Sequence, residues 1–527
     1  MLSAFTVQQC HDMALVAHVA TLRCSLPFIH FFDGFRTSHE VNKIKLLPYD
    51  EIRKLVPDEA VQLHRTRALN PLHPTLRGSN QGPDVFFQNQ ERINPFYKDV
   101  ASIVQECMEL VGKHTGREYK LYEYFGAPDA ENVVVLMGSS TYAACEAADY
   151  LIKEKKEKVG VVMIHLFRPF VMDKFLAAFP KSVKRVAVLD RCKEITALGE
   201  PLFVDTVAAF ARGGRNALIV GGRYGLGSKD FIPEHVLSVF TNLRQPQPKN
   251  SFTVGIYDDL TNTSLPFWDE PRVDTTPKGT VQCVFWGIGS DGTVGANRSA
   301  VKIIGDKTDR MAQAYFSFDA FKSGGVTQSH LRFGPTAITS QYLVTNADYV
   351  ACHFAEYAKR FRLADNIREG GAFVLNSRLN TLADWDREIP ADLRKKLAQR
   401  KAKVYNIDAR KICNDAGLGK RINMVMQTVF FKLSNVIPIK EAVHYLKESV
   451  AEEYGKKGEK VVEMNQSVID VVVSGDALKE IKYPASWATL ADDPPLQPTG
   501  NDFVDKVMRP MVYAFGDFFS PFNFNAF

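Results

Sequence analysis

The sequence predicts an α/β protein built of several doubly wound, mostly parallel-sheet domains, followed by an extended C-terminal tail. Residues 281–305 read as a strand, a glycine-rich turn and a helix, and residues 132–190 alternate between strand and helix patterns. The tail is predicted from the proline-rich sequence beyond about Glu459, where regular periodicity ends.

The stretch 281–305 begins with VQCVFW, a run without a strand breaker, and continues with glycines at 287, 289, 292 and 295. Val294, Val301 and Ile304 then recur at helical spacing. A strand, glycine turn and helix in this order aim backbone N–H groups and the positive end of the helix dipole at a phosphate. The spacing Gly-x-Gly-x-x-Gly also matches a dinucleotide fingerprint, although a turn that simply needs glycine has the same pattern.

Composition indicates an ordinary globular protein. The 527 residues are 45% hydrophobic and 24% charged, enough for about three or four domains. The net charge of +5 is spread along the chain without a long basic run, which argues against a nucleic-acid surface. No run approaches the ~18 apolar residues of a membrane span.

The eight cysteines are at positions 10, 24, 107, 145, 192, 283, 352 and 413. None of them has the spacing of a metal site or an iron–sulfur cluster, so no metal ligands are predicted. Most lie in apolar segments, which favours buried, reduced thiols.

The N-terminal region starts with helical spacing at residues 7–24, and we expect the beginning of a domain to be missing before it. The first residues resemble neither a signal peptide nor a transit peptide. A strand pattern at 27–33 leads into a polar turn. His30, Arg36, His39 and Glu40 in this part suggest either an active site or a hydrogen-bonded structural loop.

Residues 132–190 read as strand, helix, strand, helix, strand, which predicts a parallel sheet covered on both faces. Gly138-Ser-Ser follows the first of these strands, at the end where such sheets usually hold ligands. A second glycine-rich loop, residues 221–229, carries Arg223 and Lys229, which suit either a phosphate or a contact between domains. Proline-rich linkers follow at 245–250 and 266–277.

After the first glycine turn and its helix, a strand at 314–318 ends in Asp319, where a nicotinamide-binding domain would place its ribose-binding carboxylate. Lys322, Ser323, Gly324 and Gly325 follow at once and suggest a second anion-contacting loop. Further strands are expected at 346–352, 370–376 and 402–408, and helices at 409–454.

Five motifs in order, spread along most of the chain, resemble pyruvate:ferredoxin (flavodoxin) oxidoreductase. They are HFFDGFRTSHE at 30–40, GGRYGLGSKDF at 221–231, FTVGIYDDLTNTSL at 252–265, GIGSDGTVGAN at 287–297 and SGGVTQSHLRFG at 323–334.

This resemblance implies five parts: the rear of a thiamine-pyrimidine domain (1–128), a domain like the C-terminal domain of transketolase (129–250), a linker (251–277), a gamma-subunit-like domain associated with coenzyme A (278–455) and a connector (456–527). The family oxidatively decarboxylates pyruvate to acetyl-coenzyme A with thiamine diphosphate, magnesium and [4Fe-4S] clusters. Electrons pass to ferredoxin, flavodoxin or an NADP-linked flavin domain, and the complete enzyme is expected to be a homodimer. The implied compartment is the cytoplasm, or a hydrogenosome or mitochondrion in a eukaryote.

On this reading the ligand of the first glycine turn is coenzyme A, held at Gly287, Gly289, Ser290, Asp291, Gly292 and Thr293, with Lys322 to Gly325 as a second contact. Catalytic residues are expected outside this chain. The sequence lacks the cluster cysteines, and Ser290-Asp291-Gly292 lacks both the first glycine and the later asparagine of a thiamine diphosphate motif. The loop Arg77-Gly-Ser-Asn-Gln-Gly-Pro-Asp84 also departs from the family pattern. We therefore expect the isolated chain to be inactive on pyruvate.

Two alternatives follow from the same residues. One is a non-catalytic module of another reductase, such as the related part of a sulfite reductase flavoprotein subunit. The other is a nicotinamide dehydrogenase that uses the glycine turn at Gly287 together with Asp319.

Overall fold

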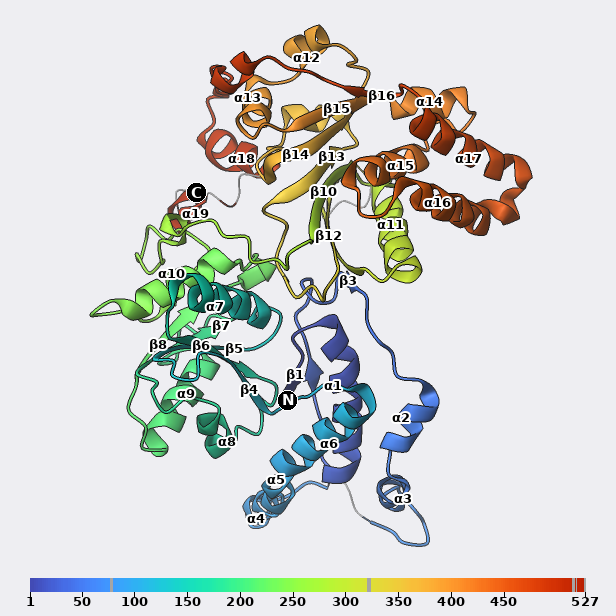
Figure 1. Ribbon diagram of the computed structural model, residues 1–527. Helices are drawn as coiled ribbons and strands as arrows, with labels where there is room; N and C mark the ends of the chain where they lie inside the picture. The colour runs from blue at the N-terminus through green and yellow to red at the C-terminus, as the bar shows by residue number, and fades with distance from the viewer. Residues whose placement is uncertain (76–78, 320–323, 514–516, 518, 526–527) are drawn as a thin grey trace. The chain divides into compact units, whose positions relative to one another are not determined.

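The computed structural model describes the chain except residues 76–78, 320–323, 514–516, 518 and 526–527 (Figure 1). It divides into two compact units. The first unit consists of Met1–Ser38, Ile44–Thr275 and Thr339–Tyr342, and the second of His39–Lys43, Thr276–Ile338 and Leu343–Phe527. In the described residues, no helix is both long and apolar enough to cross a membrane.

The first unit is built on a sheet of six strands among its described residues, in the order β4-β6-β5-β7-β8-β9. All neighbours are parallel except β4 and β6. The strands are β4 (Tyr122–Gly126), β5 (Asn132–Leu136), β6 (Val159–Ile164), β7 (Arg185–Asp190), β8 (Leu218–Arg223) and β9 (Phe252–Thr253). The predicted strand–helix alternation of 132–190 is confirmed.

Helices cover both faces of this sheet (Figure 1). Alternate residues of β5 point to opposite faces, so Val134 and Leu136 pack with α7 (Thr141–Lys155) and α10 (Pro233–Arg244). Val133 and Val135 pack on the other side with α8 (Met172–Ala177) and α9 (Pro201–Arg212). Because β6 and β7 lie on opposite sides of β5, the ends of β5 and β7 form a topological switch point.

The N-terminal part of the first unit packs α1 (Val7–Cys24) against α6 (Val100–Thr115). Helix α1 starts where the Thr6 hydroxyl accepts the N–H of Gln9. The strand expected at 27–33 is reduced to β2 (His30–Phe31), which pairs with β1 (Leu2–Ser3). Short helices fill the segment between α1 and α6: α2 (Tyr49–Leu55), α3 (Asp58–Thr66), α4 (Phe86–Glu91) and α5 (Asn94–Lys98).

The second unit contains, among its described residues, an eight-stranded sheet in the order β16-β15-β14-β13-β10-β12-β11-β3. The middle strands β15, β14, β13 and β10 are parallel, and the flanking strands are antiparallel, so this sheet is more mixed than expected. The strands are β3 (Glu40–Asn42), β10 (Val281–Ile288), β11 (Met311–Phe318), β12 (Val326–Gly334), β13 (Ala347–Cys352), β14 (Ile367–Asn376), β15 (Lys403–Ile407) and β16 (Leu478–Glu480).

One face of this sheet is covered by α11 (Thr293–Lys307), α15 (Asn423–Ser434), α16 (Ile439–Tyr454) and α17 (Glu459–Ser474). The other is covered by α12 (Leu382–Glu388) and α13 (Ala391–Gln399). Helix α14 (Ala409–Asp415) lies between β15 and α15 along the chain and packs on both α15 and α17.

The extended tail starts later than the sequence predicts. Residues 459–474 form α17, which buries Val468, Ile469 and Val472, and β16 then pairs with β15. The expectation of extended chain from 456 is therefore wrong for these residues. The pattern was hidden because the buried Asn465 interrupts the apolar face and Gly455 to Gly458 precede the helix. Beyond the strand, the described tail is irregular with short helical segments, among them α18 (Arg509–Val512) and α19 (Pro521–Asn525).

Candidate functional site

The first glycine turn lies between β10 and α11 and is organised by the side chain of Asp291. One carboxylate oxygen accepts the N–H of Ile288 at 2.9 Å, and the other accepts the N–H of Thr293 at 2.7 Å. The carboxylate thus already neutralises part of the positive end of α11. Asp291 has a structural role in the turn, and both of its oxygens are occupied by backbone donors.

Two of the four glycines are required by their surroundings. A Cβ on Gly287 would lie 2.5 Å from the Thr293 hydroxyl oxygen. Gly292 has φ +90°, and a Cβ there would lie 2.4 Å from the amide group of Asn423 on α15. A side chain at either position would therefore force a neighbouring side chain to move. A Cβ on Gly295 would instead meet open space.

Part of the α11 N-terminus can still receive an anion. Within the described residues, no acceptor is recorded for the N–H groups of Gly292, Val294 and Gly295. Ser290 and Gly295 are exposed beside them. Helix N–H groups without an acceptor, at an exposed helix start, are the donors that bind phosphate oxygens in proteins. The surface suited to an anion is the first turn of α11, adjacent to the oxygens of Asp291.

A buried histidine that the sequence did not single out holds the start of α11. The Nδ1 atom of His353, just after β13, lies 2.8 Å from the Thr293 hydroxyl. The backbone N–H of His353 donates to the backbone carbonyl of Trp286 on β10. Its Nε2 is buried with no hydrogen-bond partner in the described part of the chain. Burial lowers the pKa of His353 to about 4, although the nearby Asp291 opposes this shift, so the ring is neutral at pH 7.

The second unit should therefore lose stability in acid. The unfolded chain protonates His353 below about pH 6.5, whereas the folded chain resists protonation until about pH 4. The contribution of the neutral His353 to the free energy of unfolding is complete above pH 6.5 and should fall by about 3 kcal/mol as the pH drops from 6.5 to 4. Urea unfolding of the second unit at several pH values, with His353→Gln for comparison, measures this. An equally steep loss in His353→Gln would assign it to other groups.

The second anion-contacting loop is only partly described, because Lys322 and Ser323 lie outside the described residues. Gly324 and Gly325 are described, and both contact the first turn. The N–H of Gly289 donates to the Gly325 carbonyl at 2.7 Å, and the N–H of Gly324 donates to the Gly289 carbonyl at 3.2 Å. The two predicted glycine loops are neighbours, as the sequence suggested.

Strand order argues against the nicotinamide alternative. In a dinucleotide-binding domain, the strand that ends in the ribose-binding carboxylate lies next to the strand before the glycine turn. Here β12 lies between β10 and β11 and is antiparallel to both. Asp319 therefore follows a strand two positions, or roughly 10 Å, from β10. The spacing of the motif fits the fingerprint, but the sheet topology does not.

The loop 221–229 of the first unit is structural at Arg223, which donates to Glu200 and to the Ser251 carbonyl. The neighbouring residue Tyr224 and the loop glycine Gly225 pack against Arg191. The polar turn at 33–38 contacts this loop, because the Ser228 hydroxyl donates to the Gly34 carbonyl at 3.2 Å. His30 has a pKa lowered by burial, and Arg36 and Glu40 are buried. His30 and Arg36 belong to the first unit, whereas His39 and Glu40 belong to the second, where Glu40 begins β3.

Three family models match the chain in order. Residues 1–109 match "Pyruvate flavodoxin/ferredoxin oxidoreductase, thiamine diP-bdg". Residues 130–236 match "Pyruvate:ferredoxin oxidoreductase core domain II", and residues 282–474 match "Pyruvate ferredoxin/flavodoxin oxidoreductase".

Curated relatives agree with these models. The mitochondrial pyruvate dehydrogenase [NADP(+)] of Euglena gracilis is 61% identical over 98% of this chain, which covers 29% of that protein. The pyruvate:ferredoxin oxidoreductase of Moorella thermoacetica is 52% identical over 98% of this chain, which covers 44% of it. The chain thus spans less than half the length of these relatives.

Among solved structures, the pyruvate oxidoreductase subunit PORC of Thermotoga maritima aligns with 39% of this chain and with all of its own length. The identity is 14% and the TM-score 0.32. The family is shown by the family models and by the high identity to the curated relatives. The chain belongs to the pyruvate:ferredoxin (flavodoxin) oxidoreductase family.

Proposed function

We propose that this chain is part of a 2-oxoacid oxidoreductase that oxidatively decarboxylates pyruvate to acetyl-coenzyme A and passes the electrons to ferredoxin or flavodoxin. The observation that carries this proposal is the identity of 52% with the Moorella enzyme across nearly the whole chain. Thiamine diphosphate, magnesium and the clusters would be supplied by regions outside this chain, and the isolated chain would be inactive. The matches named above are pyruvate enzymes and lend no support to a sulfite reductase module.

We assign coenzyme A to the start of α11, within this proposed function. Its phosphates are anions, and the N–H groups of Val294 and Gly295 offer donors at the positive end of a helix. Ser290 is exposed beside these donors, and Gly324 and Gly325 are bonded to the neighbouring Gly289. Asp291 would shape the turn through its bonds to the Ile288 and Thr293 N–H groups without contacting the phosphates, because its carboxylate repels an anion.

Gly295→Asp should weaken coenzyme A binding about tenfold or more. The new carboxylate would stand beside the bound phosphate in the first turn of α11 and repel it. An acidic residue in a first helical turn is favourable for the helix itself, so folding should be unaffected. Isothermal titration calorimetry with coenzyme A measures the change in Kd.

Gly295→Ala is the matched control, because its Cβ meets open space. This variant should bind coenzyme A within about twofold of the native chain, since it adds bulk without charge. Equal affinity in the Asp and Ala variants would show that the ligand lies elsewhere. Tight binding of NADH without coenzyme A binding would reverse the ligand assignment.

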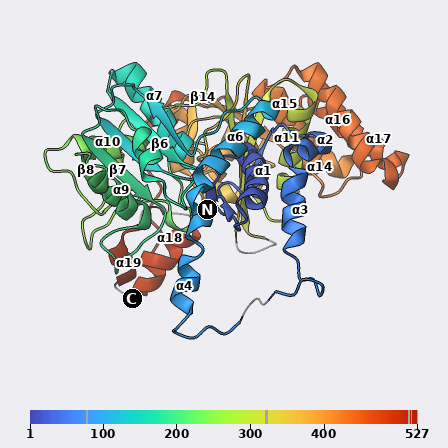
Figure 2. The same ribbon diagram turned by 90° about the horizontal axis from the view of Figure 1, so that it is seen from below.

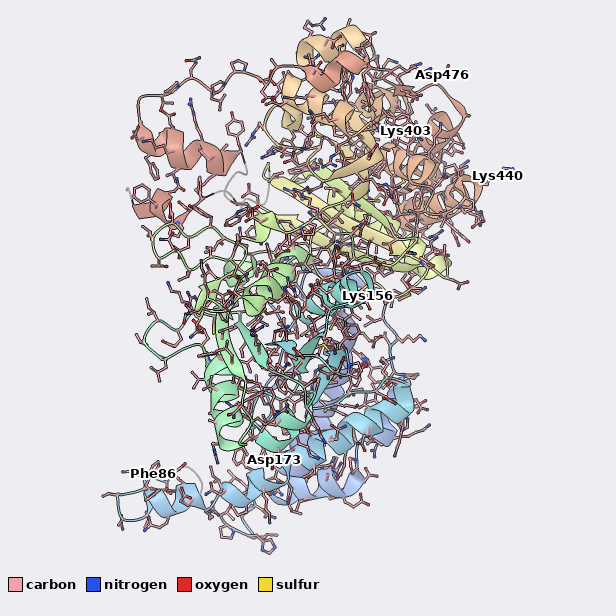
Figure 3. All side chains as sticks on the ribbon, turned by 60° about the vertical axis from the view of Figure 1, so that its left-hand side comes forward. Phe86, Lys156, Asp173, Lys403, Lys440 and Asp476 are labelled. Carbon is pink, nitrogen blue, oxygen red and sulfur yellow. The ribbon has the colours of Figure 1, made fainter. Side chains whose placement is uncertain are left out.

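An exposed apolar segment marks where a partner would bind the first unit. Residues 79–98, which we name the aromatic arm, include α4 and α5 and lie within the part that matches the thiamine-binding model. Figure 2 shows α4 at the end of a long excursion, and Figure 3 shows Phe86 at its tip, away from the sheet of the first unit. Its exposed apolar side chains are Val85, Phe86, Phe87, Ile93, Phe96 and Tyr97. So many exposed aromatic residues in one segment are typical of an interaction surface.

We propose that the aromatic arm is covered by the thiamine- and cluster-bearing regions of the complete enzyme. Phe86→Ser combined with Phe87→Ser should weaken association with these regions by at least tenfold, because exposed aromatic residues act as anchors at interfaces. Co-purification of the two parts after co-expression measures this. Leu198→Ser, which changes a residue 96% exposed outside the arm, is the control and should leave association unchanged. Undiminished association of the double variant would remove the arm from the interface.

The electron acceptor distinguishes the relatives from each other. The Moorella relative is named for ferredoxin and the Euglena relative for NADP(+). We keep ferredoxin, flavodoxin and an NADP-linked flavin domain as the candidate acceptors, and cytoplasm, hydrogenosome and mitochondrion as the candidate compartments.

A further inference from the structure

The switch point of the first unit contains a carboxylate bound by groups from two other parts of the chain. The carboxylate belongs to Asp33, in the turn after β2. One of its oxygens accepts the N–H of Ser139 at 2.5 Å, at the start of α7. The other lies 3.0 Å from an Nη atom of Arg191, which follows β7. These are the ends of the two strands between which an open α/β sheet ordinarily binds its ligand.

Several neighbouring side chains fix the position of Arg191. Its guanidinium donates to the hydroxyls of Ser139 and Ser140 at 3.3 and 3.2 Å and lies over the ring of Tyr224. Its Nε is buried without a hydrogen-bond partner among the described residues. A rigid guanidinium with fixed neighbours is suited to bind a planar carboxylate.

The adjacent acid does not serve as the partner of Arg191. Asp190 turns towards α9, where its two oxygens accept the N–H groups of Leu202 and Phe203 at 3.0 and 3.1 Å. The guanidinium is therefore paired with Asp33, which comes from a distant part of the sequence. The space for this carboxylate exists because residue 138 is glycine: it has φ +81°, and a Cβ there would lie 2.7 Å from an Asp33 oxygen.

We propose that this crevice, formed by Arg191, Ser139, Ser140 and Gly138, is a receptor for a small carboxylate whose native occupant is the Asp33 side chain. A free monocarboxylate such as formate binds there when that side chain is removed. Occupation of the receptor fixes the turn 33–38. This turn is closed by backbone hydrogen bonds from the N–H groups of Thr37 and Ser38 to the Asp33 carbonyl. The receptor thus positions the part of the HFFDGFRTSHE motif that forms this turn.

The test uses the full chain with Asp33→Ala and hydrogen exchange of residues 34–38. We expect exchange at least tenfold faster than in the native chain in chloride, and at least threefold slower again in formate at the same ionic strength. The double variant Asp33→Ala, Gly138→Ala has a methyl group in the crevice, so formate should leave its exchange unchanged. The native chain, whose receptor is full, should not respond to formate either.

Asp33→Ser is the second variant, because its side chain is as small as needed to leave room for formate but is polar, so it disturbs the fold less. It too should respond to formate. Folding of either variant in formate but not in chloride supports the receptor. Native-like exchange in Asp33→Ala, an equal response of the double variant, or no formate response in either single variant, folded or not, overturns it.

Discussion

Asp12→Ala should lower the free energy of unfolding of the first unit by about 3 kcal/mol, the lower end of the range for breaking a buried ion pair. The Asp12 side chain on α1 is fully buried and accepts two bonds from Arg117, at 2.6 and 2.9 Å, and one from the Tyr119 hydroxyl at 2.6 Å. Removing the carboxylate leaves these donors without their acceptor. Because the Arg117 side chain is 24% exposed, water can solvate part of its charge, which limits the loss.

The pH dependence separates this network from simple packing. Burial pushes the pKa of Asp12 upward, but hydrogen bonds from Arg117, Tyr119 and His11 outweigh it and hold the pKa below its usual range. The network therefore stabilises the fold above about pH 4 and is lost as the pH falls below that value. Asp12→Ala should lose this acid transition in urea unfolding. Asp129→Ala, which removes an exposed pair with Lys158, should behave like the native chain.

Gly292→Ala should destabilise the second unit by about 2–5 kcal/mol. About 1–2 kcal/mol comes from forcing alanine to adopt the left-handed φ of +90°. A further 1–3 kcal/mol or so comes from the clash of its Cβ with Asn423 on α15, which must move. Thermal or urea unfolding of the second unit measures the sum.

The neighbouring glycine provides the control within the same turn. Gly295→Ala adds the same methyl group where space is open and the backbone is helical, so it should stabilise α11 by up to about 1 kcal/mol. Similar destabilisation by the two substitutions would mean that the turn tolerates no side chain anywhere, in contrast to the geometry described here.

The parallel strands and their helices were predictable because local sequence determines them. Runs such as Val159–Ile164 are buried on both faces and alternate with helices at short spacing, and this pattern needs no distant partner. The insertion of β12 between β10 and β11, and the pairing of β16 with β15, depend on contacts between segments distant in sequence. No local pattern specifies such neighbours, which is why the dinucleotide-like spacing at Gly287 was misleading.

The glycine turn could be predicted for the same reason, because its glycines and its helix are adjacent in sequence. The residues that contact the turn could not be predicted, because His353 and Asn423 follow 60 and 130 positions after Thr293. Their only sequence signal is a polar residue in an otherwise apolar segment. Asp33 and Arg191 are similar: Asp33 lies in the motif at 30–40 and Arg191 directly follows the strand that ends at Asp190, but only the fold brings the carboxylate to the guanidinium.

The proposed function is tested most directly by reconstitution. The chain would be co-expressed with the thiamine- and cluster-bearing parts of a family relative, and viologen reduction would be followed with pyruvate and coenzyme A. We predict reduction that needs both parts and both substrates and that falls with Gly295→Asp but not with Gly295→Ala. A stable complex with bound thiamine diphosphate and clusters, yet without pyruvate-dependent reduction, would contradict the proposed function.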